Sequence, residues 1–504
     1  MASFSRFKEP WKRALTERPS ALRNEFPDYH IPDPESLVCT SHIHSFQLGT
    51  GASICTESLF SAILEAKFEV ILVTCFWASS STLSALRVVL EQLAKHRREY
   101  IRNQRAAGPD ADVLSPLRVR ICFSSRSLLQ KLLHTSSTDG YVYPPTLWHT
   151  QLGLPDQDTL KSGLIDLRVK SLFFLPFSVM HPKFLIIDRQ RAWLPSCNVS
   201  WESWLEGCVE ISGEAVTGLT KFYQQVWDRH LDGEIADLVG QNSVSAGPLS
   251  LGTLGLTSIQ SPASLFVSLP KSTTPTILLP SSHHRNPRFD LIPWHSSPSP
   301  PPTPLNCAIL RLFDMAESSI YLQTPNLTSA AVIDELLKAL KRGIDVTIVT
   351  SKGMMLLEQI VTAGTTTSRC LQSLIRNYQI CEARHTRTRS DLSGGDTEPV
   401  VDLEAQTPRL GSLRISYFCP HSANRGAGVL EEPVHSHLKL TIVDGSFTVL
   451  GSGNMDRASW FTSQELGILF QSAEFATVVN EAVGKVLSGR LSPVFSSSRP
   501  PMTG

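Results

Sequence analysis

The chain has 504 residues, with 46 Lys and Arg against 46 Asp and Glu, and 41% of its residues are apolar. This length allows two or three domains with large cores, and the apolar content excludes fibrous and wholly disordered classes. Zero net charge gives no overall electrostatic signature for nucleic-acid binding. The ten cysteines are dispersed, which is typical of reduced thiols in an intracellular protein rather than of a disulfide framework or a Cys-rich zinc site.

The most apolar run, Val70–Trp77, is far shorter than the roughly 20 residues that a membrane-spanning helix needs. The N-terminus carries Arg and Ser, but it also carries Glu9 and Glu17 and has no apolar core. This composition argues against a signal peptide and disfavours a transit peptide. We therefore expect an intracellular protein that is cytoplasmic or peripheral to a membrane, with a mitochondrial location left open.

Changes in composition divide the chain into an irregular N-terminal arm, a first α/β domain, a Ser/Pro-rich linker, a second α/β domain and a disordered tail. The expected bounds, in that order, are 1–40, 41–238, 239–305, 306–486 and 487–504. The short apolar run Thr276–Leu279 allows one strand inside the linker. The polar stretch 384–410 predicts a flexible insertion in the second domain.

Helical and β-rich patterns alternate in the same order in both domains. In chain order, the first domain is expected to form a helix at Leu59–Ala66, a strand at Phe68–Cys75, a helix at Thr82–Ala94 and a strand at Leu117–Phe123. The second is expected to form a helix at Ala308–Ala316, a strand at Ser319–Gln323, a helix at Ala331–Leu340 and a strand at Asp345–Thr350. Strands separated by helices favour parallel pairing and the α/β class.

One polar pattern is repeated near the end of each domain. It reads HPKFLIIDRQRAWLPSCN in the first domain and HLKLTIVDGSFTVLGSGN in the second. The matching pairs are His181/His437, Lys183/Lys439, Asp188/Asp444, Ser196/Ser452 and Asn198/Asn454. Agreement at five polar positions indicates a duplication rather than chance. Glu210 and Glu465 follow in corresponding runs, with one residue of slip.

The β-rich runs in both motifs predict that His and Lys, two residues apart, project from the same face of a strand about 6.5–7 Å apart. That separation suits two groups that contact one phosphate. Asp188 and Asp444 are expected to fix the far end of the strand rather than to touch substrate. Ser196 and Asn198 are expected on a neighbouring strand, where they offer a hydroxyl and an amide donor.

The paired residues suit phosphodiester cleavage. One neutral imidazole can attack phosphorus while a protonated partner gives a proton to the leaving oxygen. Lys and Asn donors can neutralise the other phosphate oxygens, with the serines in support. Glu210 and Glu465 are expected to orient the imidazoles. No metal or other cofactor is expected, because a lysine beside each histidine disfavours a divalent ion.

The two motifs resemble the duplicated HKD motifs of the phospholipase D superfamily, and the resemblance covers both domains. It implies two similar α/β sandwich domains, packed with pseudo-twofold symmetry around one active site, and a phosphohistidine intermediate. The catalytic residues that it implies are His181, Lys183, Asn198, His437, Lys439 and Asn454. It favours His181 as the nucleophile. The segment GSGNMDRASW is most similar to the cardiolipin synthase and phosphatidyltransferase branch.

We therefore expect a phosphodiesterase or phosphatidyltransferase that acts on glycerophospholipids at a peripheral membrane surface, and the sequence is compatible with a monomer. Two alternatives stay open. A nuclease of the same superfamily is disfavoured by the neutral charge, and a catalytically inactive membrane-binding scaffold is disfavoured by the intact motifs. The first motif has Pro195 and Cys197 where the superfamily usually has glycines, which affects how closely its backbone can approach a phosphate.

Overall fold

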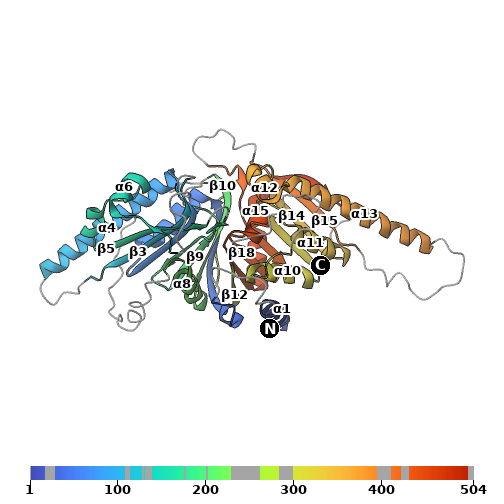
Figure 1. The fold of residues 1–504 in the computed structure, drawn as a ribbon, viewed down its shortest axis with the longest axis horizontal. Coiled ribbons are helices and arrows are strands. Elements are labelled where there is room, and N and C mark those ends of the chain that lie inside the picture. The colour runs from blue at the N-terminus through green and yellow to red at the C-terminus, as the bar shows by residue number, and fades with distance from the viewer. Residues whose placement is uncertain are drawn as a thin grey trace.

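The computed structural model describes residues 2–17, 29–107, 114–127, 130, 139–174, 178–199, 203–228, 261–282, 299–393, 410–421 and 431–497. Two halves lie side by side, the N-terminal one blue to green and the C-terminal one yellow to red (Figure 1). Eighteen of the described strands belong to one mixed sheet, and β6 (Phe173–Phe174) and β7 (Ser178–Val179) form a separate pair. The structure is of the mixed α/β class, which confirms the predicted class.

The core sheet of the first half combines parallel and antiparallel pairing. Its strands are β2 (Glu69–Phe76), β3 (Leu117–Ser125), β5 (Ile165–Ser171), β8 (Phe184–Ile187), β9 (Arg191–Pro195) and β10 (Trp204–Ser212). β2, β3 and β5 run parallel, whereas β8 is antiparallel to β2, β9 to β8 and β10 to β9. The short strand β4 (Tyr141–Val142) extends the sheet beside β5.

The second half repeats this order of pairing. Its strands are β13 (Ser319–Thr324), β14 (Asp345–Ser351), β15 (Leu413–Phe418), β17 (Leu440–Val443), β18 (Phe447–Gly451) and β19 (Glu465–Gln471). The first three run parallel, and β17, β18 and β19 follow in antiparallel order from β13. Each motif therefore enters its sheet at the equivalent strand, β8 or β17.

Helices cover the faces of the sheets. In the first half they are α2 (Gly51–Ile54), a π-helical turn (Cys55–Leu59), α3 (Phe60–Leu64), α4 (Ser81–Ala107), α6 (Pro145–Leu152), α7 (Gln157–Ser162) and α8 (Glu214–Trp227). In the second half they are α10 (Pro304–Met315), α11 (Ala330–Lys341), α12 (Leu356–Ala363), α13 (Thr367–Ser393), α14 (Arg457–Phe461) and α15 (Ala473–Leu487). All four predicted strands and all four predicted helices have counterparts here, with their ends shifted.

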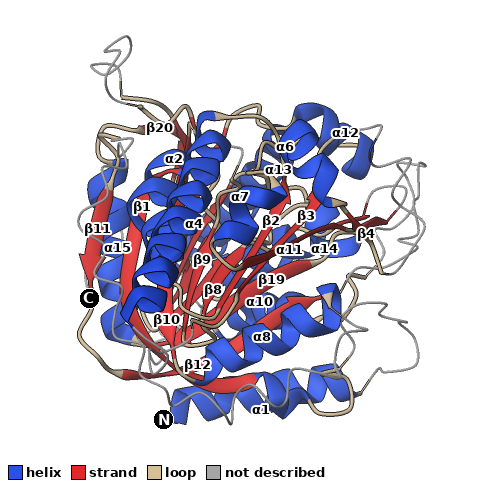
Figure 2. Ribbon diagram, turned by 90° about the vertical axis from the view of Figure 1, so that its left-hand side faces the viewer, coloured by secondary structure: helices blue, strands red, loops and turns tan. Residues whose placement is uncertain are grey.

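Strand β2 shows why these runs are almost entirely apolar. Val70 and Leu72 belong to the same buried cluster as Leu86 of α4, whereas Ile71 and Val73 belong to a cluster that includes Phe222 of α8. Both faces of the strand are thus covered, as is usual for parallel strands. Figure 2 shows α4 over one face of β2 and β3, with α8 below them.

The expected linker joins the two halves through strands. β12 (Thr273–Ser281) pairs with β1 (Val38–Thr50) along one part of its length and with β19 along another. β11 (Leu265–Ser268) also pairs with β1, which continues to β10. The strand expected around Thr276–Leu279 is therefore present and is longer than expected. The prediction that residues 261–282 only connect the two domains is wrong.

The N-terminal arm is helical rather than irregular. α1 (Ala2–Thr16) packs against α10, and Phe7 and Trp11 are fully buried. The Trp11 indole donates to the Pro304 carbonyl at 3.0 Å, and the Phe7 ring lies 5.7 Å from that of Phe447. The sequence concealed this contact because two aromatic residues stand among many polar ones. A short 3-10 helix (Pro34–Leu37) then leads into β1.

The predicted tail and insertion need new limits. Leu491–Ser496 form β20, which pairs antiparallel with β15, so the tail is not disordered over these residues. Helix α13 continues through Ser393 and Leu410 is buried, so the insertion does not extend over 384–410; residues 394–409 lie outside the described part of the chain. Within that part, no helix is long and apolar enough to cross a membrane.

Candidate active site

The first motif starts just before β8. The His181 amide donates to the Gln464 carbonyl of the second half at 3.0 Å, and Met180 forms a parallel bridge with the same residue. Lys183 is buried, and its ammonium donates to the His181 carbonyl at 2.8 Å. His181 and Lys183 thus lie in the segment that leads into the strand, not on the strand as expected.

The second motif takes the equivalent place in the second half, between β16 (His435–Ser436) and β17. The His437 amide donates to the Leu205 carbonyl of the first half at 2.8 Å. Lys439 lies beside the His437 ring, with its Nζ 2.8 Å from Nε2 and 2.8 Å from the His437 carbonyl. Each histidine is therefore placed by the backbone of the opposite half.

The imidazoles are also oriented by carboxylates from the opposite half. His181 Nδ1 lies 2.8 Å from Oε2 of Glu465, and His437 Nδ1 lies 2.8 Å from Oε1 of Glu206. Both carboxylates are buried. A carboxylate at Nδ1 favours the tautomer with its proton on that atom, so Nε2 is the nitrogen with the lone pair on each ring.

Glu210 does not have the role that the sequence predicted. Its carboxylate accepts hydrogen bonds from Arg191 and from Ser45, whereas Glu206, four residues earlier on β10, meets the second histidine. The repeat contains fewer residues between Asn198 and Glu206 than in the second motif, so matching by chain position selected the wrong glutamate. The better signal is the glycine that follows closely after Glu206 and after Glu465.

The two serines hold these carboxylates rather than pointing to a phosphate. Ser196 Oγ donates to Glu206, and Ser452 Oγ donates to Glu465 at 2.5 Å. Each serine oxygen also accepts a backbone amide from the glutamate's strand, from Gly207 at 2.9 Å or from Leu466 at 3.0 Å. The predicted support role of the serines therefore takes the form of fixing the glutamates, and their contact with phosphate stays a prediction.

The two asparagines differ in their surroundings. Asn198 Oδ1 accepts amides from Cys75 and Phe76 at 3.1 and 3.3 Å, so its nitrogen is the atom that can donate to a ligand. Asn454 Nδ2 instead donates to Asp456 at 2.9 Å, and its buried Oδ1 has no partner. The residue equivalent to Cys75 is Pro325, which has no amide hydrogen. The sequence analysis did not identify Asp456.

Both motif aspartates lie in left-handed turns, with φ of 52° at Asp188 and 51° at Asp444. Asp188 accepts the backbone amides of residues 67, 68 and 69, and Asp444 accepts those of residues 317, 318 and 319. They therefore hold the turns after β8 and β17 against the starts of β2 and β13.

Glycine is required in the second motif but not in the first. Gly451 has φ of +151°, and a Cβ there would lie 2.4 Å from the Leu466 carbonyl oxygen. Pro195 occupies the corresponding hairpin position opposite Cys208. Ser196 still donates its amide to Gly207 at 2.8 Å, so the first motif keeps its backbone position without the glycines that it lacks.

Burial sets the charges in the site. It lowers the pKa of His181, an effect that Glu465 opposes and Lys183 reinforces. Burial also lowers the pKa of His437 to about 3, although Glu206 opposes the shift, and that of Lys439 to about 7. Both imidazoles are therefore neutral near pH 7 before a phosphate is bound.

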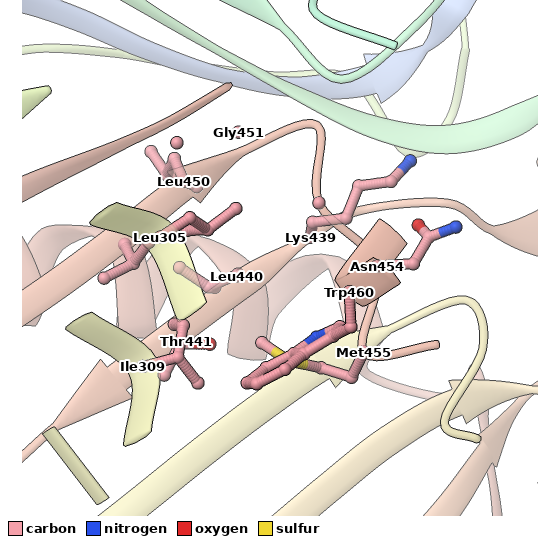
Figure 3. A pocket seen from close by; sticks show the side chains of 13 residues that line it. Leu305, Ile309, Lys439, Leu440, Thr441, Leu450, Gly451, Asn454, Met455 and Trp460 are labelled. Carbon is pink, nitrogen blue, oxygen red and sulfur yellow. The ribbon is translucent and has the colours of Figure 1, made fainter. Parts of the chain in front are cut away.

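A small pocket lies on the second-half side of the site. Figure 3 shows Lys439 and Asn454 at its polar end, with Leu305, Ile309 and Trp460 along its apolar part. The ring of Trp204, from the first half, lies 4.9 Å from that of His437. Polar and apolar side chains thus lie next to one another at this side of the site. Among the described residues, no three His, Cys, Asp or Glu side chains are grouped as metal ligands.

Comparison with known proteins shows which family and which solved structures this chain is similar to. Residues 309–486 match the family described as "Cardiolipin synthase, PLD-like domain". Among solved structures, phosphatidylserine synthase from Haemophilus influenzae is 13% identical, with a TM-score of 0.46, and the match covers 90% of this chain and 89% of that one. The phospholipase D family member Nuc from Salmonella typhimurium is 14% identical, with a TM-score of 0.26, and the match covers 44% and 97%. No curated protein matches the sequence.

The matched family and the two histidine motifs define an enzyme of phosphodiester chemistry, a phosphodiesterase or phosphatidyltransferase. Over residues 309–486 the chain is similar to the phospholipase D-like family, and the first half lies outside that match. The family match lies in the second half. The first half has the equivalent strand order, and its His181, Lys183 and Asn198 complete the site.

Proposed function

We propose that this enzyme transfers phosphatidyl groups of glycerophospholipids through a phosphohistidine, in the manner of a cardiolipin synthase. The observation that carries the proposal is the crossed pairing, in which each imidazole is held at Nδ1 by a carboxylate of the opposite half. Two oriented Nε2 atoms supply one nucleophile and one acid and base. Because one chain provides both, a monomer suffices.

In the proposed first step, His181 Nε2 attacks phosphorus and the bond to the leaving alcohol oxygen breaks. His437 gives that oxygen a proton, and Lys183, Lys439 and Asn198 donate to the remaining phosphate oxygens. The anionic phosphodiester favours the protonated imidazole, so its binding raises the pKa of His437 from the low value of the empty site. In the second step His437 deprotonates an acceptor alcohol or water, whose oxygen displaces His181.

A glycerophospholipid is the substrate class that the surroundings favour. The cationic Lys439 lines the pocket together with the apolar side chains of Leu305, Ile309 and Trp460, and a phosphate attached to a glyceride needs both kinds of neighbour. The description of the matched family supports the same class. A nuclease would need a basic track for a polyanion, and the net charge of the chain is zero. We propose that the enzyme works at the surface of an intracellular membrane.

The test is mass spectrometry of lipid products after incubation with mixed phospholipids and excess glycerol. Phosphatidylglycerol or cardiolipin would show transfer, and phosphatidic acid alone would show hydrolysis with water as the acceptor. A His181→Ala preparation controls for contaminating lipases. If the wild-type chain leaves every phospholipid intact but cleaves single-stranded oligonucleotides, the lipid assignment is wrong.

A further inference from the structure

Helix α12 has its polarity reversed. Its outward side chains are Leu356, Leu357, Ile360 and Val361, which are 47%, 76%, 54% and 42% exposed. Its buried side chain is Gln359, which is 3% exposed. A helix on the surface of a globular protein normally turns its apolar stripe to the core and its polar residues to water. Helical spacing places the four exposed residues on one continuous arc, and we call this arc the α12 apolar face.

The inward contacts of Gln359 fix this orientation. Its Oε1 accepts the amide of Thr367 at 2.6 Å, and its Nε2 donates to the Met354 carbonyl at 2.6 Å. These bonds satisfy a buried amide that would otherwise be costly. Rotating the helix to bury the apolar face would turn Gln359 outward and break both hydrogen bonds. The apolar face is therefore held outward by the fold.

The same contacts connect α12 to the candidate active site. Thr367 Oγ1 accepts the amide of Leu327 at 3.0 Å, and Leu327 forms a bridge with Met455, the neighbour of Asn454. At the other end, Ser351 Oγ donates to the carbonyl of Ser436, the residue before His437, at 2.7 Å. α12 also packs against α14, which follows the second motif.

The size and charge of the face favour a lipid surface over a protein partner. Four side chains on two helical turns present only a few hundred Å², well below the roughly 800 Å² that each partner contributes to a stable protein interface. Shallow insertion among lipid headgroups needs only such a short apolar face flanked by cations. Lys352 and Arg369 are exposed on either side of α12, and Glu358 is its one acidic residue.

We propose that the α12 apolar face inserts into the interfacial layer of a phospholipid bilayer and holds the second-motif side of the active site against the membrane. The choice of a phospholipid surface rests on the proposed function. The insertion itself requires no turnover, so it can be tested separately from catalysis.

The experiment is cosedimentation of the full chain with vesicles of phosphatidylcholine and phosphatidylglycerol in equal amounts. Replacing Leu357 and Ile360 together by Ser should lower the vesicle partition coefficient at least roughly tenfold. Complete burial of even one aliphatic side chain changes a partition coefficient by about that factor or more, so partial burial of two is enough. The matched control replaces Val88 and Val142 by Ser; both are 43% exposed and lie on α4 and β4 of the first half. The control should sediment like the wild type.

A second variant, Leu357→Glu with Ile360→Glu, should abolish sedimentation, and thermal melting of each variant confirms that it is folded. Equal sedimentation of the α12 variants and the wild type would overturn the proposal. So would a wild-type chain that ignores vesicles but self-associates through α12. Loss of vesicle binding in a chain that turns over no lipid would uphold the docking surface while the proposed function failed.

Discussion

His181 and Glu465 are 284 residues apart in the chain, yet Nδ1 of the histidine lies 2.8 Å from the carboxylate. The reciprocal pair, His437 and Glu206, spans 231 residues with the same separation. Neither half holds a histidine together with the carboxylate that orients it. The active site therefore exists only when both halves are packed together.

The crossed pairs predict a large catalytic loss from small changes. Glu465→Gln and Glu206→Gln keep the side-chain shape but remove the charge that fixes the Nδ1 proton, so each should lower kcat by a factor of about 10² to 10⁴. Glu210→Gln on the same strand is the matched control and should retain most activity, because its carboxylate meets Arg191. Hydrolysis of a soluble aryl phosphodiester provides the measurement. A loss confined to Glu210→Gln would contradict the site.

The proposed roles of the two histidines separate chemically. His181→Ala should abolish turnover of every substrate. With His437→Ala, an activated aryl phosphodiester should still release one equivalent of its first product in a burst, because an aryl oxide leaves without a proton. The covalent species should then accumulate, since no base activates the acceptor. Acid-labile, base-stable label on the His181 peptide is expected. Label found only on His437 in His181→Ala would reverse the roles.

The charges of the site predict how kcat/KM depends on pH. Attack needs neutral His181. Because burial lowers the pKa of His181 from its ordinary value of 6.5, the loss of kcat/KM at low pH should begin below pH 6.5. Lys439 has a pKa of about 7, and its positive form declines as the pH rises through that value. With an activated aryl phosphodiester, whose leaving group needs no proton from His437, we therefore expect kcat/KM to fall above about pH 7. Lys439→Arg stays protonated, so its alkaline limb should move upward. An alkaline limb at the wild-type position in Lys439→Arg would assign that limb to another group.

Turnover should survive chelation. In the proposed mechanism Lys183 and Lys439 neutralise the phosphate oxygens, the task that a divalent ion performs in other phosphoryl-transfer sites. After dialysis against EDTA, the rate with a soluble phosphodiester should equal that of the untreated enzyme. A lost rate that Mg²⁺, Ca²⁺ or Zn²⁺ restores would show that the mechanism depends on a metal.

The N-terminal helix should contribute to stability. Trp11 is fully buried against α10 and donates to Pro304, so Trp11→Ala should lower the free energy of unfolding by about 3–5 kcal/mol. Lys12→Ala removes only surface ion pairs with Glu9 and Glu35 and should cost at most about 1 kcal/mol. Urea denaturation followed by circular dichroism measures both. Equal midpoints for Trp11→Ala and the wild type would show that α1 is not docked in solution.

Short-range patterns predicted most of the core. The apolar runs of β2 and β13 and the helical spacing in α11 indicated elements whose positions the structure matches closely, whereas α4 begins near its predicted start but continues to Ala107. Such runs are informative because burial on both faces of a strand, or on one face of a helix, leaves a direct periodic signal. α1 escaped detection because its burial depends on two aromatic residues rather than on a continuous stripe.

Long-range register limited the prediction of the site. The histidines, lysines and asparagines recur at fixed offsets, so the sequence alone could pair them. Glu206 could not be found in this way, because its distance along the chain from Asn198 differs from the distance between Asn454 and Glu465. Its partner lies on the opposite half, and that contact depends on how β10 and β16 meet. Asp456 was missed for a related reason, since its role follows from Pro325, which lacks an amide hydrogen.

The crossed histidine and glutamate pairs also shape how this gene can change. A substitution at His181 is compensated, if at all, at Glu465, and one at His437 is compensated at Glu206, so covariation should link positions in opposite halves. Pro195 in one hairpin and Gly451 in the other show that the two copies of the motif already differ at a position that neither crossed pair uses.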